Sequence, residues 1–164
     1  MSEILVACFS ATGTTAELGE RLAKVAGADF FRITPAEEYT AEDLDWTDAS
    51  SRTTKEMRNS RSRPALVWDG DPTEGHSMIF LGFPIWWYIA PTLINTFLED
   101  CNLSGKRIVL FATSGGSGFG KTLEALKGSI PTDAELLEGD VFNHPVTDEE
   151  LAGWAARFQK NGRA

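Results

Sequence analysis

One turn near the N-terminus restricts the possible folds more than any other feature. The apolar run Ile4–Phe9 ends in the hydroxyl-rich turn Ser10-Ala11-Thr12-Gly13-Thr14-Thr15, and a helix-like pattern follows from Ala16. At the start of such a helix the backbone N–H groups are unpaired and the positive end of the helix dipole lies behind them. Anions bind there, and no Lys or Arg precedes Arg21. The turn therefore predicts a phosphomonoester site built almost entirely from neutral donors.

The rest of the chain alternates short β-rich runs with amphipathic helix-like segments, the pattern of parallel βαβ units. We expect strands at 3–9, 28–33, 77–82, 106–112 and 134–139, and helices at 14–26, 90–100, 118–128 and 147–160. Right-handed crossovers leave few ways to order five such strands. The prediction is an α/β fold with three layers, a doubly wound five-stranded parallel sheet in the order 2-1-3-4-5.

With 164 residues, 42% of them hydrophobic, the chain can bury one sizeable core, so 1–164 is predicted to be a single domain. The polar segment 34–75 is too long for an ordinary connection. We expect it to be an insertion that forms a surface excursion near the ligand. Its charges are expected to be solvated, with docking or an anionic cofactor as the alternatives: Glu37, Glu38, Glu42, Asp43, Asp45 and Asp48, then Arg52, Lys55, Arg58, Arg61 and Arg63.

Composition excludes several classes of function. Twenty-four acidic and fifteen basic side chains give a net charge of −9, which opposes binding to nucleic acid or anionic lipid. Cys8, Cys101, His76 and His144 lack the spacing of a metal site, so no metal is predicted and both cysteines are expected to be buried thiols. No apolar run is long enough to span a membrane and no secretory signal is evident, so we expect a cytoplasmic protein.

Three loops should meet where the chain reverses direction around a doubly wound sheet. They are Ser10–Thr15 after the first strand, Pro84–Tyr88 after the third, and Thr113–Gly120 after the fourth. The second loop presents aromatic faces, and the third is rich in glycine. Together they predict a flat aromatic ligand that carries one phosphate. The candidate binding residues are Ser10, Ala11, Thr12, Gly13, Thr14, Thr15, Pro84, Ile85, Trp86, Trp87, Tyr88, Thr113, Ser114, Gly115 and Gly116.

These three motifs, in this chain order, resemble the flavin-binding loops of the flavodoxin-like proteins. The resemblance covers nearly the whole chain and is strongest to a bacterial branch of small members. It implies a flavodoxin-type fold and FMN as the cofactor. The phosphate would lie on residues 10–15, and the isoalloxazine ring would lie between 84–88 and 113–116.

Other interpretations of the same residues compete with this one. Thr12 and Thr14 could only cap a helix, and Trp86 and Trp87 could only pack in a core or an interface. Trp46, Trp68 and Trp154 are expected to pack. Gly-Gly-Ser-Gly-Phe-Gly-Lys-Thr, residues 115–122, also matches a nucleoside triphosphate loop, although its place after the fourth strand leaves the other two loops unexplained.

Two functions are compatible with an FMN site. In the first, the protein is an electron carrier that transfers electrons through its flavin to a redox partner protein, and no catalytic side chain is predicted. In the second, it is an FMN-dependent NAD(P)H:quinone-type oxidoreductase with a small-molecule acceptor. Either a monomer or a homodimer is compatible with the sequence.

Overall fold

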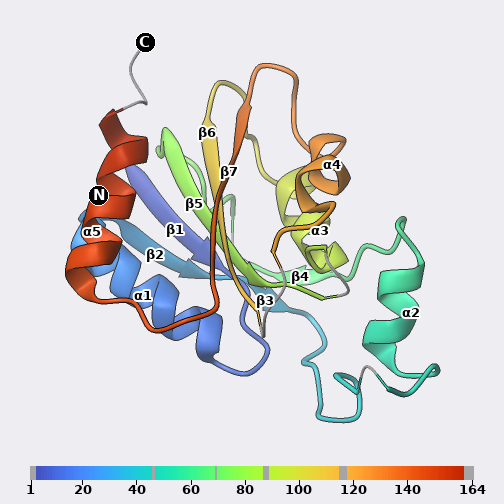
Figure 1. Cartoon of the computed structure of the whole chain (residues 1–164). Helices are drawn as coiled ribbons and strands as arrows, with labels where there is room; N and C mark the ends of the chain where they lie inside the picture. Colours follow the sequence, from blue (N-terminus) through green and yellow to red (C-terminus); the bar gives the residue numbers. More distant parts are fainter. Residues whose placement is uncertain (1–2, 46, 69, 87–88, 115–117, 161–164) are drawn as a thin grey trace.

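The computed structural model describes residues 3–45, 47–68, 70–86, 89–114 and 118–160, and it contains a five-stranded parallel sheet (Figure 1). The strands are β1 (Ile4–Cys8), β2 (Asp29–Arg32), β5 (Met78–Pro84), β6 (Arg107–Thr113) and β7 (Glu135–Phe142). Their spatial order is β2-β1-β5-β6-β7. Every neighbouring pair is parallel, so the predicted order 2-1-3-4-5 is confirmed.

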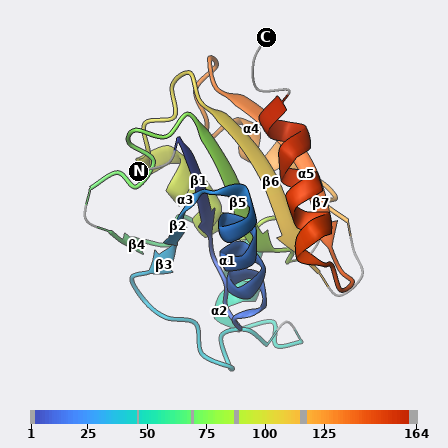
Figure 2. The same cartoon turned by 90° about the vertical axis from the view of Figure 1, so that its left-hand side faces the viewer.

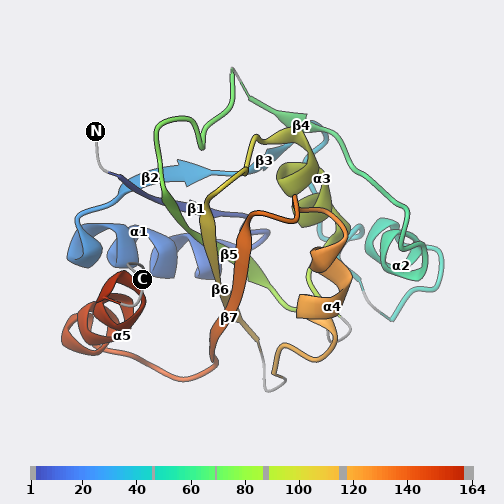
Figure 3. The same ribbon diagram turned by 90° about the horizontal axis from the view of Figure 1, so that it is seen from above.

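Helices cover both faces of the sheet and complete the three layers. α1 (Thr14–Ala26) and α5 (Asp148–Lys160) lie on one face, and α3 (Thr92–Asp100) and α4 (Thr122–Lys127) lie on the other (Figure 3). The predicted bounds of α1 are confirmed. The helix expected at 118–128 is shorter, because its first residues form a turn and the Thr122 hydroxyl donates to Phe119 O. No helix within the described part of the chain is long and apolar enough to cross a membrane.

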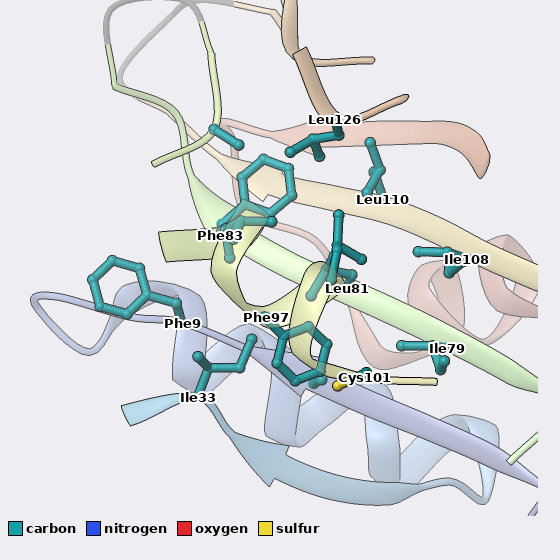
Figure 4. Packing of buried hydrophobic residues seen from close by; sticks show 14 of the residues in the cluster. Phe9, Ile33, Ile79, Leu81, Phe83, Phe97, Cys101, Ile108, Leu110 and Leu126 are labelled. Carbon is teal, nitrogen blue, oxygen red and sulfur yellow. The ribbon is translucent and has the colours of Figure 1, made fainter. Parts of the chain in front are cut away.

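Two apolar clusters form because successive strand residues point to opposite faces of the sheet. Leu5 and Ala7 of β1 face α3 and α4, where they join the cluster shown in Figure 4. Val6 and Cys8 face α1 and α5. The central strands are therefore buried on both sides, as in other parallel sheets covered by helices.

Both cysteines and Trp154 are in the core and Trp68 packs against it, as expected. Cys8 and Cys101 are buried free thiols, and burial raises the pKa of Cys8 to about 12. Trp154 is 6% exposed, and its Nε1 donates to Asp140 Oδ2 at 2.7 Å. Trp68 packs against Phe97, with ring centroids 5.6 Å apart, whereas Trp46 lies outside the described residues.

The histidine before β5 corrects one expectation. In the sequence His76 has no carboxylate or second histidine at metal-site spacing, which favours a surface or capping position, but its ring is 6% exposed and its Nε2 lies 2.9 Å from Asp29 Oδ2. The two residues are far apart in the chain and meet because β2 and β5 flank β1. This pair lies at the amino ends of the parallel strands, whereas the predicted ligand site lies at their carboxyl ends.

The insertion 34–75 contains regular structure of its own. β3 (Thr34–Pro35) pairs with β4 (Leu66–Val67) as an antiparallel two-stranded sheet, seen beside β2 in Figure 2. Between them α2 (Arg52–Arg58) stands away from the main sheet (Figure 1). Ser51 caps α2, because its Oγ accepts from Thr54 N at 3.3 Å.

β7 is longer than the sequence predicted. Its pairing with β6 shifts register between Leu110 and Phe111, where Leu110 pairs with Glu138 and Phe111 with Asp140. Gly139 is the extra residue of this β-bulge. The predicted strand ended at Gly139, whereas the observed strand continues past it to Phe142.

Candidate functional site

The turn after β1 has the geometry of an anion site. Gly13 has φ 98° and is the N-cap of α1, and its N–H donates to Ser10 Oγ at 2.9 Å. The first bond within the helix runs from Glu17 N to Gly13 O at 3.0 Å. The N–H groups of the residues between them therefore lie at the open end of the helix. The space above Gly13 is open, since a Cβ placed there would meet nothing within 4 Å.

The four hydroxyls of this turn divide into two pairs. Ser10 is 6% exposed, and its Oγ holds the turn by accepting from Gly13 N, a bond that leaves the hydroxyl proton free to donate. Thr15 Oγ1 lies 2.7 Å from Thr113 Oγ1 and ties the first loop to the third. Thr12 and Thr14 are exposed and remain available to a ligand. The helix-capping interpretation of these two threonines is wrong, because the N-cap residue of α1 is Gly13, which has no side chain to accept from the first helical amides.

Two adjoining pockets show that the three loops converge as expected. The Leu44 pocket, of about 250 Å³, is lined by Ala11, Thr12, Thr15, Leu44, Thr53, Pro84, Trp86 and Thr113. The His144 pocket, of about 530 Å³, is lined by Thr12, Thr14, Pro84, Ile85, Trp86, Thr113, Ser114 and residues 142–145. Four residues line both pockets, so the pockets meet at Thr12, Pro84, Trp86 and Thr113.

Trp86 forms the aromatic wall between these pockets. Its ring meets Phe9 and Tyr39 edge-on, with centroids 5.8 Å and 5.5 Å away. Its backbone exchanges two hydrogen bonds with Ile89, which closes the loop after β5. Trp86 thus packs against the core and lines the site at the same time. Trp87, Tyr88, Gly115 and Gly116 lie outside the described residues, so their binding roles stay predictions.

The insertion supplies part of the site, as expected from its length. Leu44 and Thr53 line the Leu44 pocket, and Tyr39 supports Trp86 from behind. The Tyr39 hydroxyl donates to Glu56 Oε1 at 2.6 Å, and burial raises the Tyr39 pKa strongly. Arg52 lies over the Tyr39 ring, 3.8 Å from its centroid, and its Nε donates to Glu56 Oε2 at 2.9 Å.

Not all of the insertion's charges are solvated. Arg52 is 18% exposed and paired, which corrects that expectation, and the only sequence signal was its i,i+4 spacing to Glu56. Arg63 Nε donates to Glu99 Oε1 at 3.0 Å on α3. The remaining cations, Lys55, Arg58 and Arg61, are exposed, as are Glu37, Glu38, Glu42, Asp45 and Asp48.

The loop between β7 and α5 was missed by the sequence analysis. Phe142, Asn143, His144 and Pro145 line the His144 pocket opposite Thr12 and Thr14. The strand was expected to end before them, and nothing in their spacing indicated a ligand. His144 is exposed, and among the described residues that line these two pockets it is the one ionisable group.

The structure gives the triphosphate-loop interpretation of 115–122 no support. In such loops the Ser or Thr hydroxyl binds Mg²⁺ and a helix begins beside the phosphates. Here the Thr122 hydroxyl is fully buried and donates to Phe119 O at 2.6 Å. α4 is a helix of only six residues. The residues 115–117 are outside the described part of the chain.

A doubly wound parallel sheet with a phosphate-type turn after its first strand and an aromatic loop after its third defines a flavodoxin-like protein. The family profile of the flavodoxins matches residues 3–158, so the chain belongs to the flavodoxin family. A search of curated proteins finds no match.

Solved structures agree with this assignment. A protein from Bacteroides eggerthii, provisionally named a flavoprotein, is 42% identical with a TM-score of 0.88, over 97% of this chain and 99% of that one. A Bacteroides uniformis protein with the same provisional name is 40% identical with a TM-score of 0.82, over 93% and 97%. A Lactobacillus acidophilus flavoprotein solved in complex with FMN shares the fold, at 18% identity and a TM-score of 0.70, over 94% and 99%.

Proposed function

We propose that this protein binds FMN and carries electrons through it to a redox partner protein. The observation that carries this proposal is the convergence of the open end of α1, the Trp86 wall and the third loop on one pair of pockets. Membership of the flavodoxin family supports a flavin, and the FMN complex of the Lactobacillus protein supports the phosphorylated form.

The described residues fit FMN chemically. The helix amides with the Thr12 and Thr14 hydroxyls would hold the phosphate, above the open space at Gly13. Trp86, Pro84 and Leu44 would exclude water from the ring. When bound, FMN supplies the electron-transfer chemistry, and the protein supplies binding and environment.

The direct test is the visible absorption of the purified protein. We expect a flavin spectrum, or its appearance when FMN is added, and release of FMN as the chromophore on denaturation. A preparation that stays colourless with excess FMN would contradict the proposal.

Replacing Thr12 or Thr14 by valine should weaken FMN binding about tenfold for each substitution. A hydrogen bond to a charged group contributes about 1.5–3 kcal/mol, and tenfold corresponds to about 1.4 kcal/mol. Riboflavin, which lacks the phosphate, should bind to both variants as tightly as to the wild-type protein. Titration of flavin fluorescence measures these affinities, and Thr132→Val, an exposed threonine on a loop outside the site, is the control. If the affinities for riboflavin and FMN fall equally, the phosphate does not bind at Thr12 and Thr14.

The His144 pocket favours a second candidate function, reduction of a quinone by NAD(P)H. In that reaction NAD(P)H and one proton convert the quinone to its hydroquinone and leave NAD(P)⁺. His144 is the one ionisable group among the described residues that line the two pockets, so it is the candidate proton donor.

Steady-state oxidation of NAD(P)H with a soluble quinone separates the two functions. If the protein is a reductase, His144→Gln should lower turnover about 100-fold, the lower end of the usual contribution of a general acid. Glu149→Gln, a change on the exposed surface of α5, is the control. Absence of quinone-dependent turnover in the FMN-loaded protein would exclude the reductase, and electron transfer would be the one remaining proposal.

A further inference from the structure

We propose that a third pocket, beside the phosphate turn, is a subsite for a second phosphate with its attached adenosine, as found in dinucleotides. We call it the Arg32 pocket. The inference rests on the proposed binding of FMN, because the subsite would extend the phosphate site of the turn that it adjoins. It adds a ligand class that the flavin site itself does not require.

The pocket lies at the carboxyl end of β2, next to β1. It has a volume of about 260 Å³ and is lined by Phe9, Ser10, Ala11, Arg32, Ile33, Thr34, Pro35, Glu38 and Tyr39. Ala11 also lines the Leu44 pocket, so the two cavities share this residue of the phosphate turn. A ligand that continues beyond a phosphate at the turn can therefore reach the Arg32 pocket.

Arg32 is held in place at the edge of this turn. Its Nη2 donates to Ser10 O at 3.1 Å, and Ser10 Oγ accepts from Gly13 N at 2.9 Å. Each guanidinium has five N–H donors, so one bond to a carbonyl leaves others to meet an anion. The exposed Arg32 side chain thus links the end of β2 to the phosphate turn and places a positive charge beside it.

The charge of Arg32 is not neutralised by a carboxylate. Arg21, Arg52, Arg63 and Arg107 each form an ion pair, whereas Arg32, like the exposed Arg58, Arg61 and Arg157, has no acidic side chain within 4.0 Å among the described residues. Although the chain has a net charge of −9, an unpaired arginine beside an anion site would attract a second anion locally. Arginine is also the side chain best suited to phosphate, since its fork can donate two parallel bonds.

The remaining lining residues suit a nucleoside rather than a bare anion. Glu38 offers a carboxylate, which accepts from sugar hydroxyls as acidic residues do in dinucleotide-binding folds. Half-buried Tyr39 forms part of one wall, whereas Phe9 is 2% exposed and lies behind the lining. A free phosphate would use Arg32 alone, whereas an adenosine phosphate would also use Glu38 through its ribose hydroxyls.

The second phosphate could come from FAD, whose adenylyl group continues from the flavin phosphate, or from NAD(P)H bound beside FMN. Flavin fluorescence titration with riboflavin, FMN and FAD tests the first source. Calorimetry with ADP on the FMN-loaded protein tests the second. We expect the affinity for at least one of the two ligands, FAD or ADP, to fall about tenfold in Arg32→Gln and about threefold in Glu38→Gln. FMN and riboflavin should change less than twofold.

Arg61→Gln, which removes an exposed cation of the insertion outside the site, is the matched control for net charge. The inference is overturned if neither FAD nor ADP binding depends on Arg32. It is also overturned if Arg32→Gln weakens FMN and FAD equally, since Arg32 would then serve only the flavin phosphate. Failure of wild-type protein to bind FMN at all would instead contradict the proposed function, so the two failures are distinct.

Discussion

Replacing Gly13 by valine is expected to weaken FMN binding about 100-fold. Gly13 has φ 98°, a conformation that a β-branched residue adopts only with strain of about 1–3 kcal/mol. Relaxation of the turn would displace the Gly13 N–H from Ser10 Oγ and turn the first amides of α1 away from the phosphate. Loss of two or three hydrogen bonds of about 1 kcal/mol each gives a change of this size. Fluorescence titration measures it directly.

Gly27→Val is the matched control for this variant. Gly27 caps the other end of the same helix with φ 65°, and a Cβ there also meets nothing within 4 Å. Its backbone strain should therefore be similar, while its distance from the turn should leave FMN affinity unchanged. If both variants lose FMN to the same degree, the loss at Gly13 reflects a weakened helix and not the geometry of the anion site.

The phosphate turn was predictable because its information is local. A strand, a glycine with a positive φ and a helix start follow one another within residues 4–16, and each is encoded by its own few residues. The convergence of three loops was predictable too, since the sheet order follows from the crossover rule. The hydrogen bond from Gly13 N to Ser10 Oγ was not predictable, because whether a hydroxyl accepts from its own turn depends on the exact path of the backbone.

Contacts between distant segments were beyond prediction. The Tyr39–Arg52–Glu56 contacts that support Trp86 join two parts of an insertion without clear periodicity. The His76–Asp29 pair depends on two strands flanking a third. Nothing in the sequence singles out Arg32, and its place beside Ser10 follows only from the parallel pairing of β2 with β1.

The insertion also affects which partners can reach the site. Leu44 and Thr53 close the side of the site that faces α2, and Tyr39 fixes Trp86 from the same direction. The His144 pocket, which the insertion does not line, is therefore the side from which a partner or a small acceptor can approach. Both proposed functions consequently use the surface around the β7–α5 loop.

The bulge in β7 explains the largest stability effect that we expect. Gly139→Ala should destabilise the protein by about 3 kcal/mol or more, because the added Cβ would overlap the Leu110 carbonyl oxygen and lie 2.7 Å from Trp154 Cζ2. Neither neighbour can move freely, since Leu110 is in the central part of the sheet and Trp154 is fixed by its bond to Asp140.

For a chain of this size the loss corresponds to a Tm lower by about 6–12 °C, measurable by thermal denaturation followed by circular dichroism. Gly153→Ala on α5 is the control, since its Cβ would meet nothing within 4 Å and the helix should gain about 0.5–1 kcal/mol. The two Gly→Ala substitutions should therefore change the Tm in opposite directions, and this difference tests the geometry of the bulge. An unchanged Tm for Gly139→Ala would mean that β7 pairs with β6 in a different register from Leu110 onwards.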